Sequence, residues 1–364
     1  MGRQLRAYLG RHWPMSRVRE LVDAAPEKQV ALRREGTGDE MGLRGLLVPS
    51  SLGGLGAGQV ELGLVCEELG YALYPGPAFG TVAMAVNALL VLADGPARDE
   101  LLRRIVDGAT VAVAAFDQAD GWVANGAALR AEQGPSGWTL TGTKTLVVDG
   151  VSADVVLALA ATGDTLRLFS VERGAAGLTA TALDVLDPTR EIAQVEFRGT
   201  PAQPLSGDVG ASVDAFLDRA RLALAAEQVG VADRCLTMST EYAKVRTQFN
   251  RPIGSFQAVK HMCADMLVAV QTARDAVRYA AWSLDMDRPE AARAVCIAAA
   301  HAAETGQRVA ADTIQVHGGM GFTWECDAHF YYKRATANAV LFGDADHHYQ
   351  RLADLLERDL DEER

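Results

Sequence analysis

The feature that most constrains the fold is the order of three zones with different hydrophobic periodicity. In residues 192–197, Ala193, Val195 and Phe197 alternate with polar residues, and this period of two is typical of a half-buried β-strand. Further short runs of this kind lie between about residues 110 and 203, separated by turn residues. Because helical periodicity precedes and follows this zone, the sequence predicts an α+β fold.

The two outer zones carry apolar residues at helical spacing. Before about residue 108, Leu62, Val65, Cys66 and Leu69 follow at i, i+3, i+4 and i+7. After about residue 209, apolar residues keep steps of three and four over long stretches that are rich in alanine. We therefore expect three parts. They are an N-terminal helical domain over residues 1–108, a middle antiparallel β-barrel domain over residues 109–206 and a C-terminal four-helix bundle over residues 207–364.

Charge and composition exclude several classes of function. Of 364 residues, 35 are Lys or Arg and 47 are Asp or Glu, which gives a formal net charge of −12. A chain this acidic is repelled by nucleic acids and by anionic lipid, so a phosphate-bearing ligand must be held by a few well-placed cations. The five cysteines form no CxxC pair, and the longest apolar tract, residues 81–93, contains Asn87. We expect no metal site, no membrane span and a cytoplasmic location.

Residues 242–266 read YAKVRTQFNRPIGSFQAVKHMCADM. This stretch resembles the acyl-CoA dehydrogenase family, which carries Y-A-x-x-R-x-x-F-x-x-P-I-x-x-F-Q in its third domain. Residues 315–322, QVHGGMGF, are similar to the family's Q-x-x-G-G-x-G-F, and weaker matches lie at residues 47–56 and 142–154. The resemblance covers nearly the whole chain, and the family's fold has the same order of helical, β and helical domains.

The resemblance implies an FAD cofactor whose pyrophosphate and adenosine are bound by residues of the C-terminal zone. A guanidinium can donate two parallel hydrogen bonds to a phosphate, which is the role implied for Arg246. An isolated helical arginine is usually only solvated, and an isolated GGxG is usually a helix-terminating loop, but the register of both motifs favours the cofactor role. The implied cofactor-binding residues are Arg246, Phe249, Gln257, Gln315, Gly318 and Gly319.

Two groups of residues depart from the family's pattern. The flavin-holding T-E-P stretch is absent at residues 114–118, and Leu146 and Val148 replace the tryptophan and threonine of W-x-T. The family's reaction also needs a carboxylate that removes the α-proton of an acyl thioester. Phe342 and Ala220 occupy the two positions where members keep that base. We therefore assign no catalytic residue to this chain.

This pattern resembles the non-catalytic subunit of bacterial heteromeric α2β2 acyl-CoA dehydrogenases. The resemblance implies that the chain supplies the residues that bind the pyrophosphate and adenosine of an FAD, and that a sister subunit carries the base. It also implies an acyl-CoA substrate, a class that in such heteromers includes CoA thioesters of steroid side chains, and an electron-transfer flavoprotein as the electron acceptor. Two alternatives remain open. One is a self-sufficient homo-oligomeric dehydrogenase with Asp344 as its base, and the other is a cofactor-free scaffold of the same fold.

Overall fold

The computed structural model describes residues 2–35, 41–116 and 128–362. Contacts between Cα atoms divide the chain into two compact units. The first unit comprises residues 1–19, 59–74 and 221–364, and the second comprises residues 20–58 and 75–220. Both units combine stretches that are far apart in the sequence. The expected domain boundaries near residues 108 and 206 remain a prediction.

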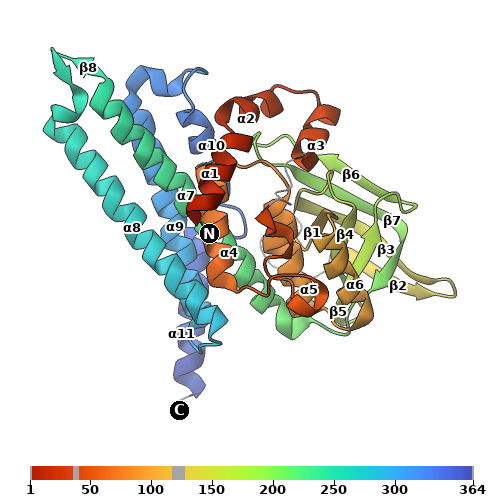
Figure 1. The fold of residues 1–364 in the computed structure, drawn as a ribbon. Coiled ribbons are helices and arrows are strands. Elements are labelled where there is room, and N and C mark those ends of the chain that lie inside the picture. The colour runs from red at the N-terminus through yellow and green to blue at the C-terminus, as the bar shows by residue number, and fades with distance from the viewer. Residues whose placement is uncertain (1, 36–40, 117–127, 363–364) are drawn as a thin grey trace. The chain divides into compact units, whose positions relative to one another are not determined.

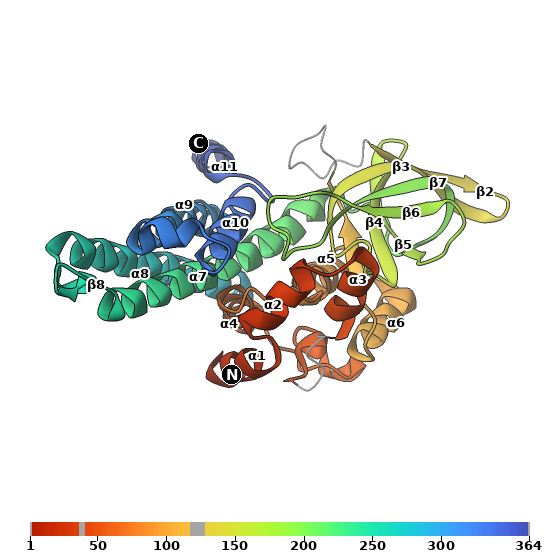
Figure 2. The same cartoon turned by 90° about the horizontal axis from the view of Figure 1, so that it is seen from above.

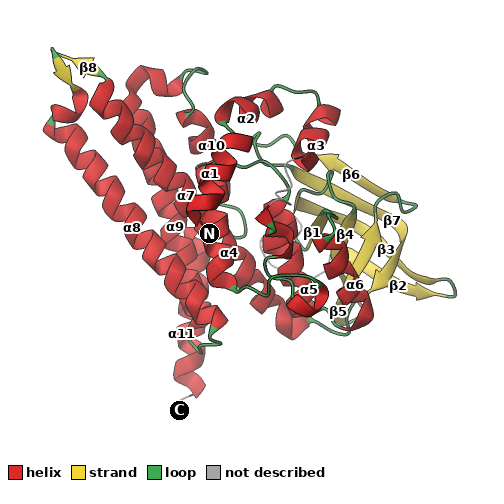
Figure 3. Ribbon diagram, in the orientation of Figure 1, coloured by secondary structure: helices red, strands yellow, loops and turns green. Residues whose placement is uncertain are grey.

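The first unit is built from helices (Figures 1 and 3). Its long helices are α7 (Val213–Val245, in this unit from Arg221), α8 (Gln257–Asp285), α9 (Ala291–His317) and α11 (Ala345–Glu362). Its shorter elements are α1 (Gly2–His12), the start of α2 (Met15–Val22), α4 (Gln59–Tyr71), η6 (Ile253–Ser255), η7 (Gly318–Phe322), α10 (Ala328–Asn338) and strands β8 (Thr247–Gln248) and β9 (Arg251–Pro252). Helix α9 packs against α8, α10 and α11.

The helices of this unit bury the faces that their spacing predicts. Of the apolar stripe that the spacing predicts on α8, Met266, Val270, Ala273 and Val277 are at most 5% exposed, while Met262 and Leu284 at its two ends are half-buried. Helix α4 crosses α7 so closely that a Cβ on Gly230 would overlap the carbonyl oxygen of Glu67. Only glycine fits at such a crossing, because any side chain would force the two backbones apart.

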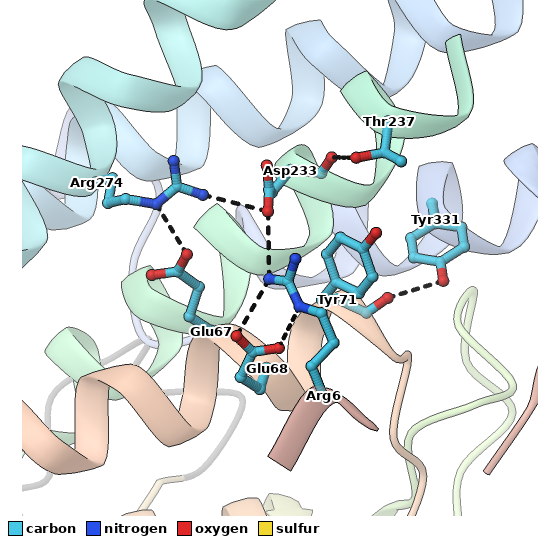
Figure 4. A network of polar contacts seen from close by, with 8 residues as sticks. All are labelled: Arg6, Glu67, Glu68, Tyr71, Asp233, Thr237, Arg274 and Tyr331. Atoms are coloured by element: carbon cyan, nitrogen blue, oxygen red, sulfur yellow. Dashed lines mark hydrogen bonds and ion pairs between the residues drawn. The ribbon is translucent and has the colours of Figure 1, made fainter. Parts of the chain in front are cut away.

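A network of charged side chains joins α1, α4, α7 and α8 in the first unit (Figure 4). Arg6 donates to Glu68 at 2.6 Å and to Asp233 at 3.4 Å. Arg274 donates to Glu67 at 2.8 Å and lies 3.3 Å from the same Asp233 carboxylate. Burial raises the pKa of Glu68 although Arg6 acts against it. Asp233 lies between two guanidinium groups. The network therefore holds the four helices against one another, and it is not a ligand site.

The second unit combines short helices with a sheet. Its helices and turns are the end of α2, α3 (Pro26–Glu35), η2 (Leu43–Gly45), η3 (Ser50–Leu52), the π-helix η4 (Phe79–Val86), α5 (Asn87–Leu92), α6 (Gly95–Val106), η5 (Gly210–Ser212) and the start of α7. Its strands are β1 (Val111–Ala114), β2 (Leu129–Gly134), β3 (Gly137–Val148), β4 (Val155–Thr162), β5 (Thr165–Glu172), β6 (Leu178–Ala182) and β7 (Ile192–Pro204). Figure 2 shows β6 beside β7, which lies next to β3.

The strand pairings of the sheet form a closed ring in the order β4, β2, β3, β7, β5 and back to β4. Ala193, Val195 and Phe197 of β7 are at most 1% exposed, which confirms the predicted alternation. The expected antiparallel domain is found in part: five strand pairs are antiparallel, but β1 pairs with β4 in parallel, and β2 pairs with β4 in parallel at Arg130 and Ala161. Alternation of apolar residues indicates burial on one face and carries no information about strand direction.

Asp149 is a buried carboxyl group that follows β3. It accepts a hydrogen bond of 3.1 Å from the Gly80 backbone N–H. Burial, and next the charge of Glu191, raise the pKa of Asp149 to about 7, while Arg33, Arg190 and the Gly80 N–H act in the opposite direction. Because the unfolded chain binds this proton less tightly, the stability contributed by the protonated group is fully present below about pH 4 and is lost as the pH rises through about 7.

We therefore expect Asp149→Asn, which imitates the protonated form, to be stabilising at high pH. Its free energy of unfolding should match that of the wild type near pH 4 and exceed it by about 4 kcal/mol at pH 8. Urea titrations of both proteins across this range measure the difference. A difference that does not change with pH would contradict the expectation.

Candidate functional site

An open pocket of about 680 Å³ lies in the first unit, between the end of α7 and the end of α9. Its lining residues are Tyr242, Arg246, Gln248, Ile253, Val316, His317, Gly318, Gly319, Met320, Thr323 and Glu325. Both motifs that carried the family resemblance therefore meet at one place, although they are about seventy residues apart in the sequence. The fold brings them together because α7 and α9 end on the same side of the first unit (Figure 1).

Arg246 directly follows α7 and stands in an ordered turn. Its backbone N–H donates to the Tyr242 carbonyl at 2.9 Å, and its carbonyl accepts from the Ile253 N–H at 2.8 Å. The side chain is exposed and lines the pocket. An exposed guanidinium whose backbone is fixed on both sides is well suited to an anionic ligand that arrives from solution.

Gly318 and Gly319 form the opposite wall of the pocket, and they have different roles. Gly318 ends α9 with a φ of 59° and a ψ of −143°, a conformation that is essentially restricted to glycine. Its N–H donates to the Gln315 carbonyl, so Gly318 shapes the turn and does not offer its amide to a ligand. A Cβ on Gly319 would meet no atom within 4 Å, so a ligand can approach the backbone there closely. Inside the 3-10 helix η7 the N–H groups from Met320 onwards donate to carbonyls of the helix itself, so the amide left for a phosphate is that of Gly319.

The floor of the pocket is aromatic. The rings of Tyr242 and His317 stack with their centroids 4.3 Å apart, and His317 Nδ1 lies 2.8 Å from the Thr313 carbonyl oxygen. Glu325 lies at the rim, where hydrogen bonds from its own backbone N–H and from the Thr323 hydroxyl lower its pKa. The lining of the pocket therefore combines one guanidinium, the backbone amide of Gly319, an aromatic floor and a carboxylate that can accept hydrogen bonds from hydroxyl groups.

Three of the six predicted cofactor residues meet in this pocket, namely Arg246, Gly318 and Gly319. The other three lie near it without lining it. Phe249 is 86% exposed at the turn between β8 and β9, where it contacts the Phe256 ring. Gln257 is exposed at the start of α8, close to His261. Gln315 is exposed on α9 and contributes its backbone carbonyl to the turn at Gly318.

Sequence reasoning did not assign roles to Tyr242, Gln248, His317 and Glu325, although all four line the pocket. Tyr242 and His317 lie within the two quoted motifs, so the motifs draw attention to both residues. The sequence does not show that their rings stack. Gln248 belongs to β8, whose turn at Phe249 and Asn250 has φ values of 52° and 59°. Two successive positive φ values are required by the tight hairpin turn, and the Asn250 side chain favours them.

The donor set fits the pyrophosphate and adenosine of an FAD cofactor. A guanidinium and the Gly319 amide suit a diphosphate, an aromatic floor suits a planar base, and a carboxylate suits ribose hydroxyls. In the described part of the chain, no group of three or more His, Cys, Asp or Glu side chains could hold a metal ion. No helix among the described residues is long and apolar enough to cross a membrane.

The two positions where the family resemblance places a catalytic carboxylate are buried and apolar. Phe342 is 1% exposed, has a φ of 63°, and accepts a hydrogen bond of 3.3 Å on its carbonyl from Arg221 Nε. Ala220 is completely buried. Asp344 is exposed, and its Oδ1 accepts from the His347 backbone N–H at 2.9 Å, as expected for a residue that caps the N-terminus of α11.

The flavin-holding positions lie in the second unit. Leu146 has a φ of 57° and lies in a bulge of β3 between Lys144 and Val147, where the register with β7 shifts. Val148 is 1% exposed and pairs with Ile192 of β7. The stretch at residues 114–118 lies partly outside the described residues.

Comparisons with known proteins agree with the motifs. The model of the acyl-CoA dehydrogenase N-terminal domain matches residues 15–109, and the model of the C-terminal domain matches residues 210–356. The acyl-CoA dehydrogenase IpdE2 of Mycobacterium tuberculosis is 35% identical over 303 residues, which are 83% of this chain and 80% of that protein. The protein of the same name from Mycolicibacterium smegmatis is 32% identical over 86% of this chain and 84% of its own length. The chain belongs to the acyl-CoA dehydrogenase family.

Two solved structures of this family resemble the chain over almost its whole length. One is a variant of the Tcur3481-Tcur3483 steroid ACAD, with a TM-score of 0.87, 29% identity, and coverage of 99% of this chain and 97% of that chain. The other is the ChsE4-ChsE5 complex from Mycobacterium tuberculosis, with a TM-score of 0.86, 28% identity, and coverage of 98% and 96%. The chain therefore resembles subunits of heteromeric acyl-CoA dehydrogenases.

Proposed function

We propose that this chain is the non-catalytic subunit of a heteromeric, FAD-dependent acyl-CoA dehydrogenase. Its role is to bind the pyrophosphate and adenosine of an FAD whose reactive ring is held by a sister subunit that also carries the base. When bound, FAD supplies the oxidation that converts an acyl-CoA thioester into its α,β-unsaturated form. Arg246, the Gly319 amide and the stacked rings of Tyr242 and His317 bind and orient the cofactor's diphosphate end.

The observation that carries this proposal is the contrast between two sets of positions. The residues proposed to meet the diphosphate are present, because Arg246 and Gly319 line one pocket together with the turn residue Gly318. The set that would remove the substrate proton is replaced by Phe342 and Ala220, which are at most 1% exposed and have no group that could accept a proton. A subunit that binds the diphosphate of FAD but has no catalytic base at these positions is expected to work with a partner subunit that supplies the base.

Two further observations support assembly with a sister chain. Four large apolar side chains on α8 are 43–62% exposed, namely Leu267, Val268, Tyr279 and Trp282. A chain with so much apolar surface on one helix is typical of an oligomer subunit. The resemblance to the ChsE4-ChsE5 complex and to a steroid acyl-CoA dehydrogenase favours an α2β2 assembly that acts on a steroid-derived acyl-CoA. We propose an electron-transfer flavoprotein as the electron acceptor.

The proposal predicts how flavin content depends on the partner. The chain purified alone should be nearly colourless, because Leu146 and Val148 replace the residues that hold the flavin ring in the family. The same chain co-expressed with a base-bearing homologue encoded beside it should carry FAD. Absorbance spectra of both preparations give the flavin-to-protein ratio. A stoichiometric flavin in the chain purified alone would contradict the proposal, and no flavin in either preparation would favour the cofactor-free scaffold.

Asp344 separates the partner-subunit function from the self-sufficient alternative. In Asp344→Asn we expect flavin bleaching by an acyl-CoA in a single turnover to change less than about threefold, because asparagine caps α11 equally well and no base is lost. The control Asp344→Ala should lose about 1 kcal/mol of stability and keep the same bleaching rate. A true base contributes roughly 10²–10⁴-fold. If the asparagine variant stopped bleaching while keeping its flavin, the chain would be catalytic.

A further inference from the structure

A second, much smaller cavity lies inside the helices of the first unit, away from the FAD pocket. It is lined by α7, α9, the end of α10 and the start of α11, and its polar lining residues are Arg221, Gln228, Asn338 and His348. Each of these four side chains is more than nine-tenths buried. The cavity offers about 10 Å³ to the centre of a water molecule, which corresponds to about one molecule.

Three polar atoms of these side chains have no hydrogen-bond partner among the described residues. They are Gln228 Oε1, Asn338 Oδ1 and His348 Nδ1. The remaining amide atoms are bound, since Gln228 Nε2 donates to the Ala335 carbonyl at 2.9 Å and Asn338 Nδ2 donates to Glu227 Oε2 at 3.2 Å. Rotating either amide would place its oxygen against a carbonyl or a carboxylate, so the atoms left without a partner on these two lining residues are both acceptor oxygens.

We propose that this cavity binds one ordered water molecule, held between Gln228 Oε1, Asn338 Oδ1 and His348 Nδ1. The water donates one hydrogen to each of the two amide oxygens. Its own oxygen accepts from His348 in the tautomer that carries the ring proton on Nδ1, in competition with the Gly343 backbone carbonyl, which also accepts a hydrogen bond from this imidazole. Buried waters in proteins typically make about three hydrogen bonds of this kind to otherwise unpaired groups.

The charges around the cavity favour a neutral ligand. The Arg221 guanidinium in the lining repels a cation, and the two amide oxygens repel an anion. Burial, together with the charges of Arg221, His347 and Arg351, lowers the pKa of His348 to about 3, although the Gly343 backbone acts against them. The imidazole is therefore neutral at physiological pH, as the hydrogen-bond balance requires.

The water would connect three segments of the first unit. Gln228 lies on α7, Asn338 ends α10, and His348 lies in the first turns of α11. Gly306 of α9 leaves room for this arrangement, because a Cβ there would overlap the Gln228 amide nitrogen. The site therefore positions residues 338–348, the segment that contains the left-handed turn at Phe342 where catalytic members of the family carry their base.

A crystal structure of the full chain at high resolution tests the proposal directly. We expect one spherical density peak within about 2.7–3.2 Å of all three atoms. Crystals pressurised with xenon should show no xenon there, because xenon enters dry apolar cavities. An empty cavity, bound xenon, or an anomalous peak after soaking in rubidium or bromide would each overturn the proposal, the last by showing an ion instead of water.

A double-mutant cycle provides a second test in solution. Gln228→Met and Asn338→Leu each remove one of the two amide oxygens. If one water bridges both, either substitution releases it, so the double variant should lose clearly less stability than the sum of the single losses. As a control, Gln228→Met should be additive with Ser283→Ala, since Ser283 is buried on α8 and does not line the cavity. Additive losses in the Gln228–Asn338 pair would contradict a shared water.

Discussion

Replacing Arg334 by methionine should lower the free energy of unfolding by about 3–5 kcal/mol, since it leaves a buried carboxylate without its cation. Arg334 lies on α10 with a side chain 1% exposed, and its Nη1 lies 2.8 Å from Oε1 of Glu227 on α7, which is 2% exposed. Glu227 also accepts from Asn338 at 3.2 Å. Transferring a carboxylate out of water is costly, and in this protein the guanidinium offsets that cost.

The measurement is a urea denaturation of each variant at neutral pH. The double variant Arg334→Met, Glu227→Gln should recover much of the lost stability, because a neutral amide needs no counter-charge and can still accept from Asn338. Arg198→Ala is the matched control, since Arg198 pairs with Glu196 on an exposed strand and its removal should cause no measurable change. If Arg334→Met were as stable as that control, the ion pair would not stabilise the fold.

The sequence contains no signal for this ion pair. Charged residues on helices are by default solvated, and periodicity does not identify a glutamate that faces an arginine more than a hundred residues away. The same limit applies to η4, where all eight residues from Phe79 to Val86 are buried. A segment that is apolar on every side shows no periodicity, so the sequence predicts an apolar helix but cannot distinguish an α-helix from a π-helix.

The candidate site could be predicted where a motif fixes both residue type and backbone. Arg246, Gly318 and Gly319 belong to motifs in register, and all three line one pocket. A motif does not show which way a side chain points. Gln315 and Gln257 were assigned by the same resemblance, and both side chains are exposed outside the pocket lining. Their proposed contacts with the cofactor depend on where the adenosine lies beyond the lined pocket.

Phe249 illustrates a different limit. A phenylalanine in a motif is most often a core residue, but the left-handed turn at Phe249 and Asn250 turns its side chain outwards, and it is 86% exposed. Exposing a large aromatic ring on a rigid hairpin is unfavourable in an isolated chain. Its position beside the pocket is therefore consistent with a surface that becomes covered when cofactor and partner assemble.

The second large effect is expected at Arg246 and depends on the proposed function. In the complex with the sister subunit, Arg246→Ala should weaken FAD binding by about 2–5 kcal/mol, which is the cost of removing one partner of a desolvated charge pair. This corresponds to a rise in the dissociation constant of roughly 30-fold to several thousand-fold. Arg246→Lys should restore only part of the affinity, because an ammonium cannot donate two parallel hydrogen bonds to a phosphate.

Titration of FAD into the stripped complex, followed by calorimetry or flavin fluorescence, measures this loss without any need for turnover. The matched control is Lys244→Ala, which removes an exposed positive charge at the same end of α7 from a residue that does not line the pocket. In a chain with a net charge of −12, losing any cation weakens the attraction of an anionic ligand, and the control measures that general effect. If Arg246→Ala and Lys244→Ala weakened FAD binding equally, the positive charges would attract FAD only through the overall electrostatic field of the chain. A large loss confined to Arg246 would instead identify its guanidinium as the specific partner of the diphosphate.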